Sequence, residues 1–143
     1  MNKQTRNIIN VSLTLVAIYL YSFTASNIET EILGFNSFKF LISIAVLIQF
    51  LIFLPSFIFK TEKFYDLTGS LTYISVTSIA YFSLDNPTTT DTILFLYVVI
   101  WAGRLGIFLF RRVNKVGKDV RFDKAKKKFF WFLQYWMGQA AWV

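Results

Sequence analysis

Five apolar runs divide the sequence and limit the folds that it can adopt. They cover residues 8–23, 38–59, 67–84, 93–110 and 129–143. A helix of about 20 residues, within a range of about 17–25, crosses the apolar core of a bilayer. The runs therefore predict an all-α protein, a multi-pass membrane bundle of about five spans in a single domain.

The runs differ in what they predict about their surroundings. The third run is rich in serine and threonine but has no charge after Asp66, which suits a helix inside a bundle better than one that faces lipid. The abundant aromatic residues are expected chiefly to face lipid or to anchor the interfaces. The fifth run has 15 residues and stops at Val143 without a closing charge or loop. We expect this span to be truncated and the chain to be the N-terminal part of a longer protein.

The composition agrees with a membrane protein and excludes several kinds of active site. Hydrophobic residues make up 55% and charged residues 16%, against about 45–50% and about 25% in soluble domains. The absence of cysteine excludes disulfides, thiolate metal sites and cysteine nucleophiles. The absence of histidine removes the commonest metal ligand and the usual general base near neutral pH. We predict no metal site, and no phosphate-binding glycine loop, dinucleotide fingerprint or serine elbow is present.

Positive charge alternates with the spans. Basic residues precede the first span (Lys3 and Arg6) and the third span (Lys60 and Lys63), and nine more follow the fourth span within 111–128. The two intervening loops are acidic, with Glu29 and Glu31 in one and Asp85 and Asp91 in the other. The positive-inside rule then places the N-terminus in the cytoplasm. We expect an integral protein of the bacterial inner membrane, with the first run as an uncleaved signal anchor or, alternatively, a cleaved signal peptide.

The stretch 111–128 holds nine basic and two acidic residues and so accounts for the whole net charge of +7. A basic loop between two apolar runs is typical of a cytoplasmic membrane loop that meets anionic lipid. No RNA-binding or DNA-binding module surrounds it, so we expect no nucleic-acid partner.

Two charged residues lie near the cytoplasmic ends of consecutive expected spans. Arg104 lies seven residues before Arg111, which places it about 10 Å inside the boundary. It either faces a functional site or extends its side chain to the interface. Asp66 opens the third run at a similar depth. It either favours the helix dipole or forms an ion pair or catalytic couple with Arg104.

The segment 117–123, GKDVRFD, lies within the basic stretch. It is either a solvated run of charges or a site where Lys118 and Arg121 hold a phosphate. Asp119 and Asp123 would then orient them or bind a ribose hydroxyl. Gln134 and Gln139 in the fifth run either form interhelical hydrogen bonds or line a pocket.

The segments KFYDLTGSLTY (63–73) and WAGRLGIFLFRRVNKVGKDVRFD (101–123), followed by the glutamines of LQYWMGQAAWV, resemble the steroid 5α-reductase-like membrane family. The similarity is to its bacterial branch, long described as a domain of unknown function, and covers only the N-terminal half of the family. It implies an all-helical membrane fold and NADPH-dependent reduction of a carbon–carbon double bond conjugated to a carbonyl. The implied substrates are lipid-like and enter from the bilayer.

The resemblance also implies roles for individual residues. Asp66 falls where the family has an acid that polarises the substrate carbonyl, and Arg104 falls in the span that closes the cofactor pocket. Trp101, one turn from Arg104, falls where the steroid reductases have a catalytic tyrosine. An indole N–H can donate a hydrogen bond but cannot supply a phenolic proton. The family's main NADPH contacts lie in its second half, so we expect the 143-residue chain alone to be inactive.

Two other functions remain open. One is a non-enzymatic transport or scaffold protein whose basic loop binds anionic lipid. The other is a membrane lipid methyltransferase, because related membrane folds perform that reaction with a different cofactor. Binding of NADPH or of S-adenosylmethionine would distinguish the three hypotheses.

Overall fold

A computed structural model describes residues 2–24 and 31–143 and confirms the all-helical class. Its elements are α1 (Lys3–Thr24), β1 (Glu31–Ile32), β2 (Phe35–Asn36), α2 (Ser37–Ile58), α3 (Tyr65–Phe82), α4 (Thr89–Val116), the short 3-10 helices η1 (Val120–Phe122) and η2 (Ala125–Lys127), and α5 (Phe129–Trp142). Strands β1 and β2 pair antiparallel in a small hairpin. Glu29, part of the topology argument, lies outside the described residues.

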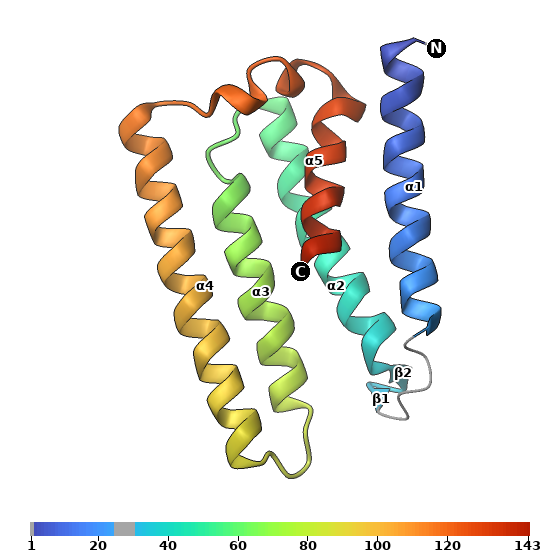
Figure 1. Cartoon of the computed structure of the whole chain (residues 1–143), viewed down its shortest axis with the longest axis vertical. Helices are drawn as coiled ribbons and strands as arrows, with labels where there is room; N and C mark the ends of the chain where they lie inside the picture. Colours follow the sequence, from blue (N-terminus) through green and yellow to red (C-terminus); the bar gives the residue numbers. More distant parts are fainter. Residues whose placement is uncertain (1, 25–30) are drawn as a thin grey trace.

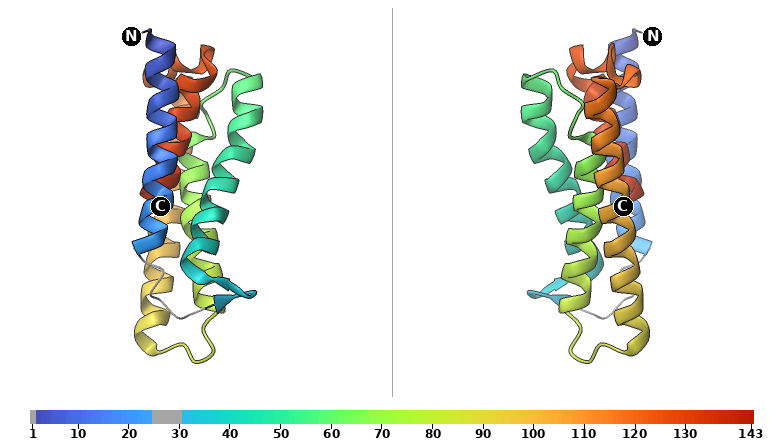
Figure 2. Two further views of the ribbon diagram at one scale, coloured as in Figure 1. Left: turned by 90° about the vertical axis from the view of Figure 1, so that its right-hand side faces the viewer. Right: turned by 90° about the vertical axis from the view of Figure 1, so that its left-hand side faces the viewer.

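The helices run side by side, and chain order is not spatial order (Figure 1). The last helix, α5, lies between α1 and α2, whereas α4 packs on α3 at the other edge. The N-terminus and the segment 117–128 lie at one end of the bundle, which we call the loop end. Figure 2 shows the hairpin and the α3–α4 connection at the opposite end, with the C-terminus at mid-height. The basic segment and the basic N-terminus therefore share one end.

Two helices, α2 and α4, are long and apolar enough to cross a membrane. Large apolar side chains on them are exposed, including Ile58 at 70%, Tyr97 at 70% and Ile100 at 68%. Exposed apolar surface of this kind favours a lipid environment. That all five helices cross the bilayer stays a prediction.

The expected fourth run ends at Phe110, but α4 continues to Val116. Its start is fixed by a capping box in which Thr88 and Asp91 exchange hydrogen bonds. Its end is set by Gly117, which has a φ of +89° that glycine adopts without strain. The expectation that 111–128 is a loop throughout is therefore wrong, because charged residues continue a helix readily and only the glycine stops it.

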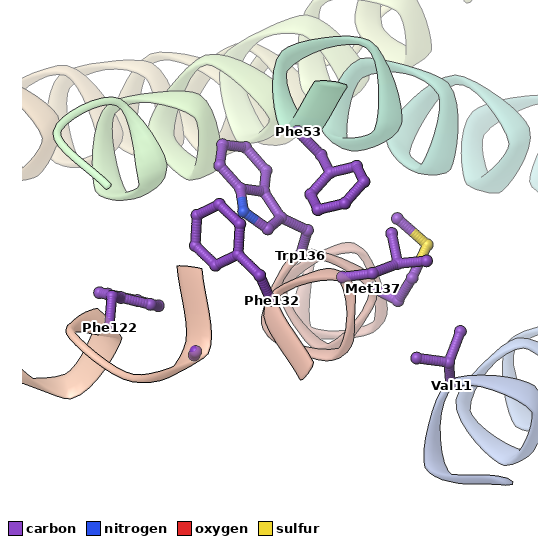
Figure 3. Packing of buried hydrophobic residues seen from close by; sticks show 8 residues of the cluster. Val11, Phe53, Phe122, Phe132, Trp136 and Met137 are labelled. Carbon is purple, nitrogen blue, oxygen red and sulfur yellow. The ribbon is translucent and has the colours of Figure 1, made fainter. Parts of the chain in front are cut away.

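The hydrophobic core lies where α5 meets α2 and η1 (Figure 3). Phe53, Phe132 and Trp136 are fully buried and contact one another through their rings. Phe122 of η1 packs against Phe132 at 5.9 Å between ring centroids. The expectation that the aromatic residues chiefly face lipid fails for this group, because α5 is inserted between its neighbours and needs bulky side chains to fill the contact.

Helix α3 is packed inside the bundle, as its serine and threonine content predicts. Thr68, Ser70 and Thr72 are buried. A Cβ atom on Gly106 of α4 would lie 2.6 Å from the Ser70 Cβ atom, so α3 and α4 approach closely at that level. Small residues permit such contact between helix backbones.

Candidate functional site

Asp66 and Arg121 meet at the loop end. Asp66 lies in the first turn of α3, ahead of the apolar run that begins at Leu67, and its side chain is only 16% exposed. The Arg121 Nη2 atom lies 3.9 Å from the Asp66 Oδ2 atom. Arg121 also donates from Nε to both carboxylate oxygens of Asp119, at 3.0 Å and 2.9 Å. One guanidinium group thus faces two carboxylates.

The charges of this cluster change each other's protonation. Hydrogen bonds from Arg121 lower the pKa of Asp119 below its ordinary value of 3.8, and the same bonds raise the pKa of Arg121. Burial raises the pKa of Asp66, and Arg121 opposes that effect. Of the two carboxyl groups that face Arg121, Asp66 therefore has its pKa raised and Asp119 has its pKa lowered.

Asp123 organises the outer part of the cluster. It accepts a hydrogen bond from Lys118 Nζ at 3.2 Å and lies 3.8 Å from Lys126 Nζ. The Lys118 side chain is 60% exposed and that of Arg121 55%. Both cations are thus accessible to a ligand. The structure brings together four of the six site residues expected from the sequence, namely Asp66, Lys118, Arg121 and Asp123.

Glu62 anchors the segment 117–128 and was not among the expected site residues. Its side chain is 3% exposed, and its two oxygens accept hydrogen bonds from the Asp119 backbone N–H at 3.0 Å and from Lys126 Nζ at 2.7 Å. The only signal in the sequence is an acidic residue between Lys60 and Lys63, in a stretch that otherwise predicts a basic loop. Its partners are distant in the chain, so spacing does not reveal them.

Tyr65 and Phe122 hold the same segment against the bundle. Their rings lie 4.8 Å apart, and the Tyr65 hydroxyl donates to the Tyr135 carbonyl oxygen at 3.0 Å. Phe122 is 1% exposed. A buried aromatic contact and the Glu62 ion pair together fix η1 and η2 over the ends of α3 and α5.

Arg104 does not join this cluster. It is exposed and forms no ion pair in the described part of the chain, so of the two alternatives for Asp66 the ion pair with Arg104 is wrong. The buried residues of α4 are Ala102, Gly106 and Val113, and the first two lie on either side of Arg104 in the sequence. Successive residues turn by about 100° around a helix, so Arg104, two positions from each, points to the opposite side.

Trp101 also lies away from Asp66. It is 44% exposed and packs edge-on against Tyr73, with ring centroids 5.3 Å apart. Tyr73 follows Asp66 by seven residues, about 10 Å along α3. Trp101 and Arg104 line one surface groove of about 660 Å³ formed by side chains of α4 alone.

The fold and the charged cluster at the loop end together define the class of protein. It is an all-helical protein in which two helices are long and apolar enough to cross a membrane, with the charged cluster at one end of the bundle. Residues 52–143 match a family described as proteins of unknown function (DUF1295), and the chain belongs to that family. The match contains the whole cluster, from Glu62 to Lys126. No curated protein and no solved structure matches the chain.

Proposed function

We propose that this protein is the N-terminal half of an NADPH-dependent membrane reductase that acts on a carbon–carbon double bond conjugated to a carbonyl. Its substrate is lipid-like, and its loop end faces the cytoplasm of a bacterial cell. The observation that carries the proposal is the half-buried Asp66 carboxyl 3.9 Å from the exposed Arg121, in a segment that also presents the exposed Lys118. The resemblance of the segments around these residues to the steroid 5α-reductase-like family supplies the type of reaction.

Asp66 is the group that acts on the substrate in this proposal. Hydride addition to a conjugated double bond leaves negative charge on the carbonyl oxygen, and a hydrogen-bond donor at that oxygen stabilises it. A carboxyl group donates only while it is protonated. Burial raises the pKa of Asp66, which favours that form.

The exposed cations of the cluster fit the phosphate groups of NADPH. Lys118 and Arg121 would hold a phosphate through charge-assisted hydrogen bonds, and Asp123 would orient Lys118 or accept from a ribose hydroxyl. When bound, NADPH supplies the hydride. Arg104 points away from this group, so a role for it in cofactor binding requires a part of the protein outside the described residues.

The test is NADPH oxidation in membranes that contain the product of the complete reading frame, with a long-chain conjugated enone as substrate. We expect Asp66→Asn to lower turnover at least tenfold while leaving NADPH affinity within about twofold, because Asn is a weaker donor and does not contact the nucleotide. Asp85→Asn, in the loop at the opposite end, is the control. Binding of S-adenosylmethionine instead of NADPH would replace this proposal with a lipid methyltransferase.

A second candidate function, an anionic-lipid-binding scaffold or transport protein, rests on a different observation. Six basic residues of the stretch 111–128 are exposed and form no ion pair within residues 2–24 and 31–143: Arg111, Arg112, Lys115, Lys124, Lys127 and Lys128. Cations at this position attract anionic headgroups. Native mass spectrometry should then show retained phosphatidylglycerol, lost on charge reversal of Lys124, Lys127 and Lys128, with no NADPH binding.

A further inference from the structure

A groove of about 390 Å³ lies between α2 and α3, near the loop end of the bundle. Helix α2 contributes Ile52 and Pro55 to its lining, the α2–α3 connection contributes Phe59 and Phe64, and α3 contributes Leu71. We call it the α2–α3 groove. No residue of the charged cluster is among its lining residues. Its volume falls within the range of about 300–1,000 Å³ that is typical of ligand pockets.

The surface of the groove suits a hydrocarbon chain. Phe59, Phe64 and Leu71 are large apolar side chains that the bundle leaves exposed. The hydroxyl group of Thr68, which also lines the groove, donates its proton to the Phe64 carbonyl oxygen at 2.7 Å and so offers no donor to a ligand. The groove runs inward from the connection as far as Ile52 and Leu71, each six residues from the nearer end of its helix, about 9 Å. An acyl chain of a membrane lipid can therefore lie along it.

Two lysines flank the end of the groove that lies in the α2–α3 connection (Figure 1). Lys60 and Lys63 are exposed and form no ion pair with any residue in 2–24 or 31–143. The carboxylate between them, that of Glu62, is buried and already paired with Lys126. Helix α2 ends at Ile58, so both lysines lie just past a segment that is able to cross a membrane. Cations at that level attract anionic headgroups.

The backbone of Lys60 adopts a conformation that glycine usually takes. Its φ is +50°, in the left-handed region. The Lys60 N–H donates to the Phe57 carbonyl oxygen at 3.2 Å, and the Thr61 N–H donates to the Ser56 carbonyl oxygen at 2.9 Å, which is the pattern with which many helices end on a glycine. A lysine at this position costs backbone free energy, which a contact of its side chain with a ligand would offset.

We propose that the α2–α3 groove binds an anionic phospholipid, with one acyl chain along the groove and the phosphate group at Lys60 and Lys63. The two ammonium groups donate charge-assisted hydrogen bonds to phosphate oxygens, as basic pockets between spans do. A zwitterionic lipid adds a positive charge that opposes the lysines, and inorganic phosphate has no chain to fill the groove. The site does not depend on the proposed reductase function. It also shares no residue with the cations of 111–128 on which the second candidate function rests.

The first experiment is thermal unfolding of the protein in a neutral detergent, because a ligand that binds only the folded state raises the melting temperature. We expect phosphatidylglycerol to raise the melting temperature by several degrees in a saturable manner. Phosphatidylcholine with the same acyl chains should raise it much less, and inorganic phosphate should leave it unchanged. An equal rise with phosphatidylcholine or with inorganic phosphate, or no rise with phosphatidylglycerol, overturns the proposal.

Three variants that each remove one positive charge test the lysines. Lys60→Gly and Lys63→Gln should each weaken the apparent affinity for phosphatidylglycerol about fivefold, whereas the control Lys3→Gln, at the start of α1, should leave it within about twofold. Lys60→Gly should also raise the melting temperature of the lipid-free protein, because glycine adopts a positive φ without strain. An equal loss of affinity in Lys3→Gln, or an unchanged affinity in Lys60→Gly, overturns the proposal.

A matched pair of leucines tests the groove itself. Leu71 lines the groove and is 50% exposed, whereas Leu51 of α2 lies outside it and is 54% exposed. Leu71→Trp should weaken the affinity for phosphatidylglycerol about tenfold, because it excludes at least two methylene groups of the lipid from the groove. Leu51→Trp should not change it. Equal affinities in the two variants overturn the proposal, and so does a dimer that displaces the lipid in native mass spectrometry, because a second copy of the chain would then fill the groove.

Discussion

Glu62 and Lys126 form an ion pair, with 2.7 Å between Oε2 and Nζ, that joins positions 64 residues apart in the chain. Both side chains are shielded from solvent, at 3% and 19% exposure. The second Glu62 oxygen accepts the Asp119 backbone N–H. The connection between α2 and α3 therefore holds the segment that presents Arg121 to Asp66.

Replacing Glu62 should loosen this segment. Glu62→Gln keeps an acceptor for the Asp119 N–H but removes the charge that Lys126 contacts at 2.7 Å, so that Lys126 keeps only the 3.8 Å contact with Asp123. Loss of a charged hydrogen bond by a shielded group costs about 1–3 kcal/mol. We expect a lower melting temperature in detergent and faster trypsin cleavage at Lys124–Lys128. The control is Glu31→Gln in the exposed hairpin, which should change neither measurement. Equal cleavage rates in both variants would refute the anchoring role of Glu62.

The Asp119–Arg121 interaction should depend on pH in a defined direction. Hydrogen bonds from Arg121 lower the pKa of Asp119 in the folded protein. The stabilisation is therefore complete above the ordinary value of 3.8 and is lost as the pH falls through the lower folded value. NMR titration of ¹³C-labelled aspartate should give a midpoint below 3.8 for Asp119.

Two variants test the cause of that shift. Arg121→Ala should return the Asp119 midpoint toward its ordinary value, because it removes the donors. Lys118→Ala should leave the midpoint unchanged, because Lys118 pairs with Asp123. An Asp119 midpoint that shifts equally in both variants would show that the summed charge of nearby cations, rather than the Arg121 hydrogen bonds, lowers the pKa of Asp119.

Gly106 and Gly103 form a matched pair on α4. A Cβ atom at Gly106 would lie 2.6 Å from the Cβ and Oγ atoms of Ser70, whereas a Cβ at Gly103 would meet nothing within 4 Å. Gly106→Ala should therefore push α3 and α4 apart and destabilise the protein by about 1–3 kcal/mol. Gly103→Ala should be neutral or stabilise the helix by up to about 1 kcal/mol. Thermal unfolding in detergent measures the stability of both variants. A Gly103→Ala variant that is less stable than Gly106→Ala would contradict the close α3–α4 contact.

The membrane orientation can be tested with reporter fusions. Asn86 lies in the connection between α3 and α4, and Gly117 lies at the loop end, at the other end of α4. Since α4 is long and apolar enough to cross a membrane, we expect a phosphatase fusion to be active only at Asn86 and a fluorescent fusion only at Gly117. If the fusions at Asn86 and Gly117 report the same side of the membrane, the proposed topology is excluded.

The sequence by itself determined the helices. Apolar runs of sufficient length specify where each helix forms, and local signals set the ends of α4, namely the capping box of Thr88 and Asp91 and the positive φ of Gly117. These signals act between residues near in the chain, so they can be read without a structure. Hydropathy alone ends the fourth run at Phe110, whereas the glycine at position 117 marks the end of α4 at Val116.

Tertiary structure alone decided which charges meet. The sequence gives the depth of Arg104 along α4 but not its direction, because a helix facing lipid carries apolar residues all round and shows no polar face to identify the buried one. Packing of Gly106 against Ser70 turns Arg104 outward, and Asp66 pairs with Arg121 instead. Likewise, Glu62 gains its partners only when the chain returns after α4, so no local pattern encodes the contact that holds the candidate site together.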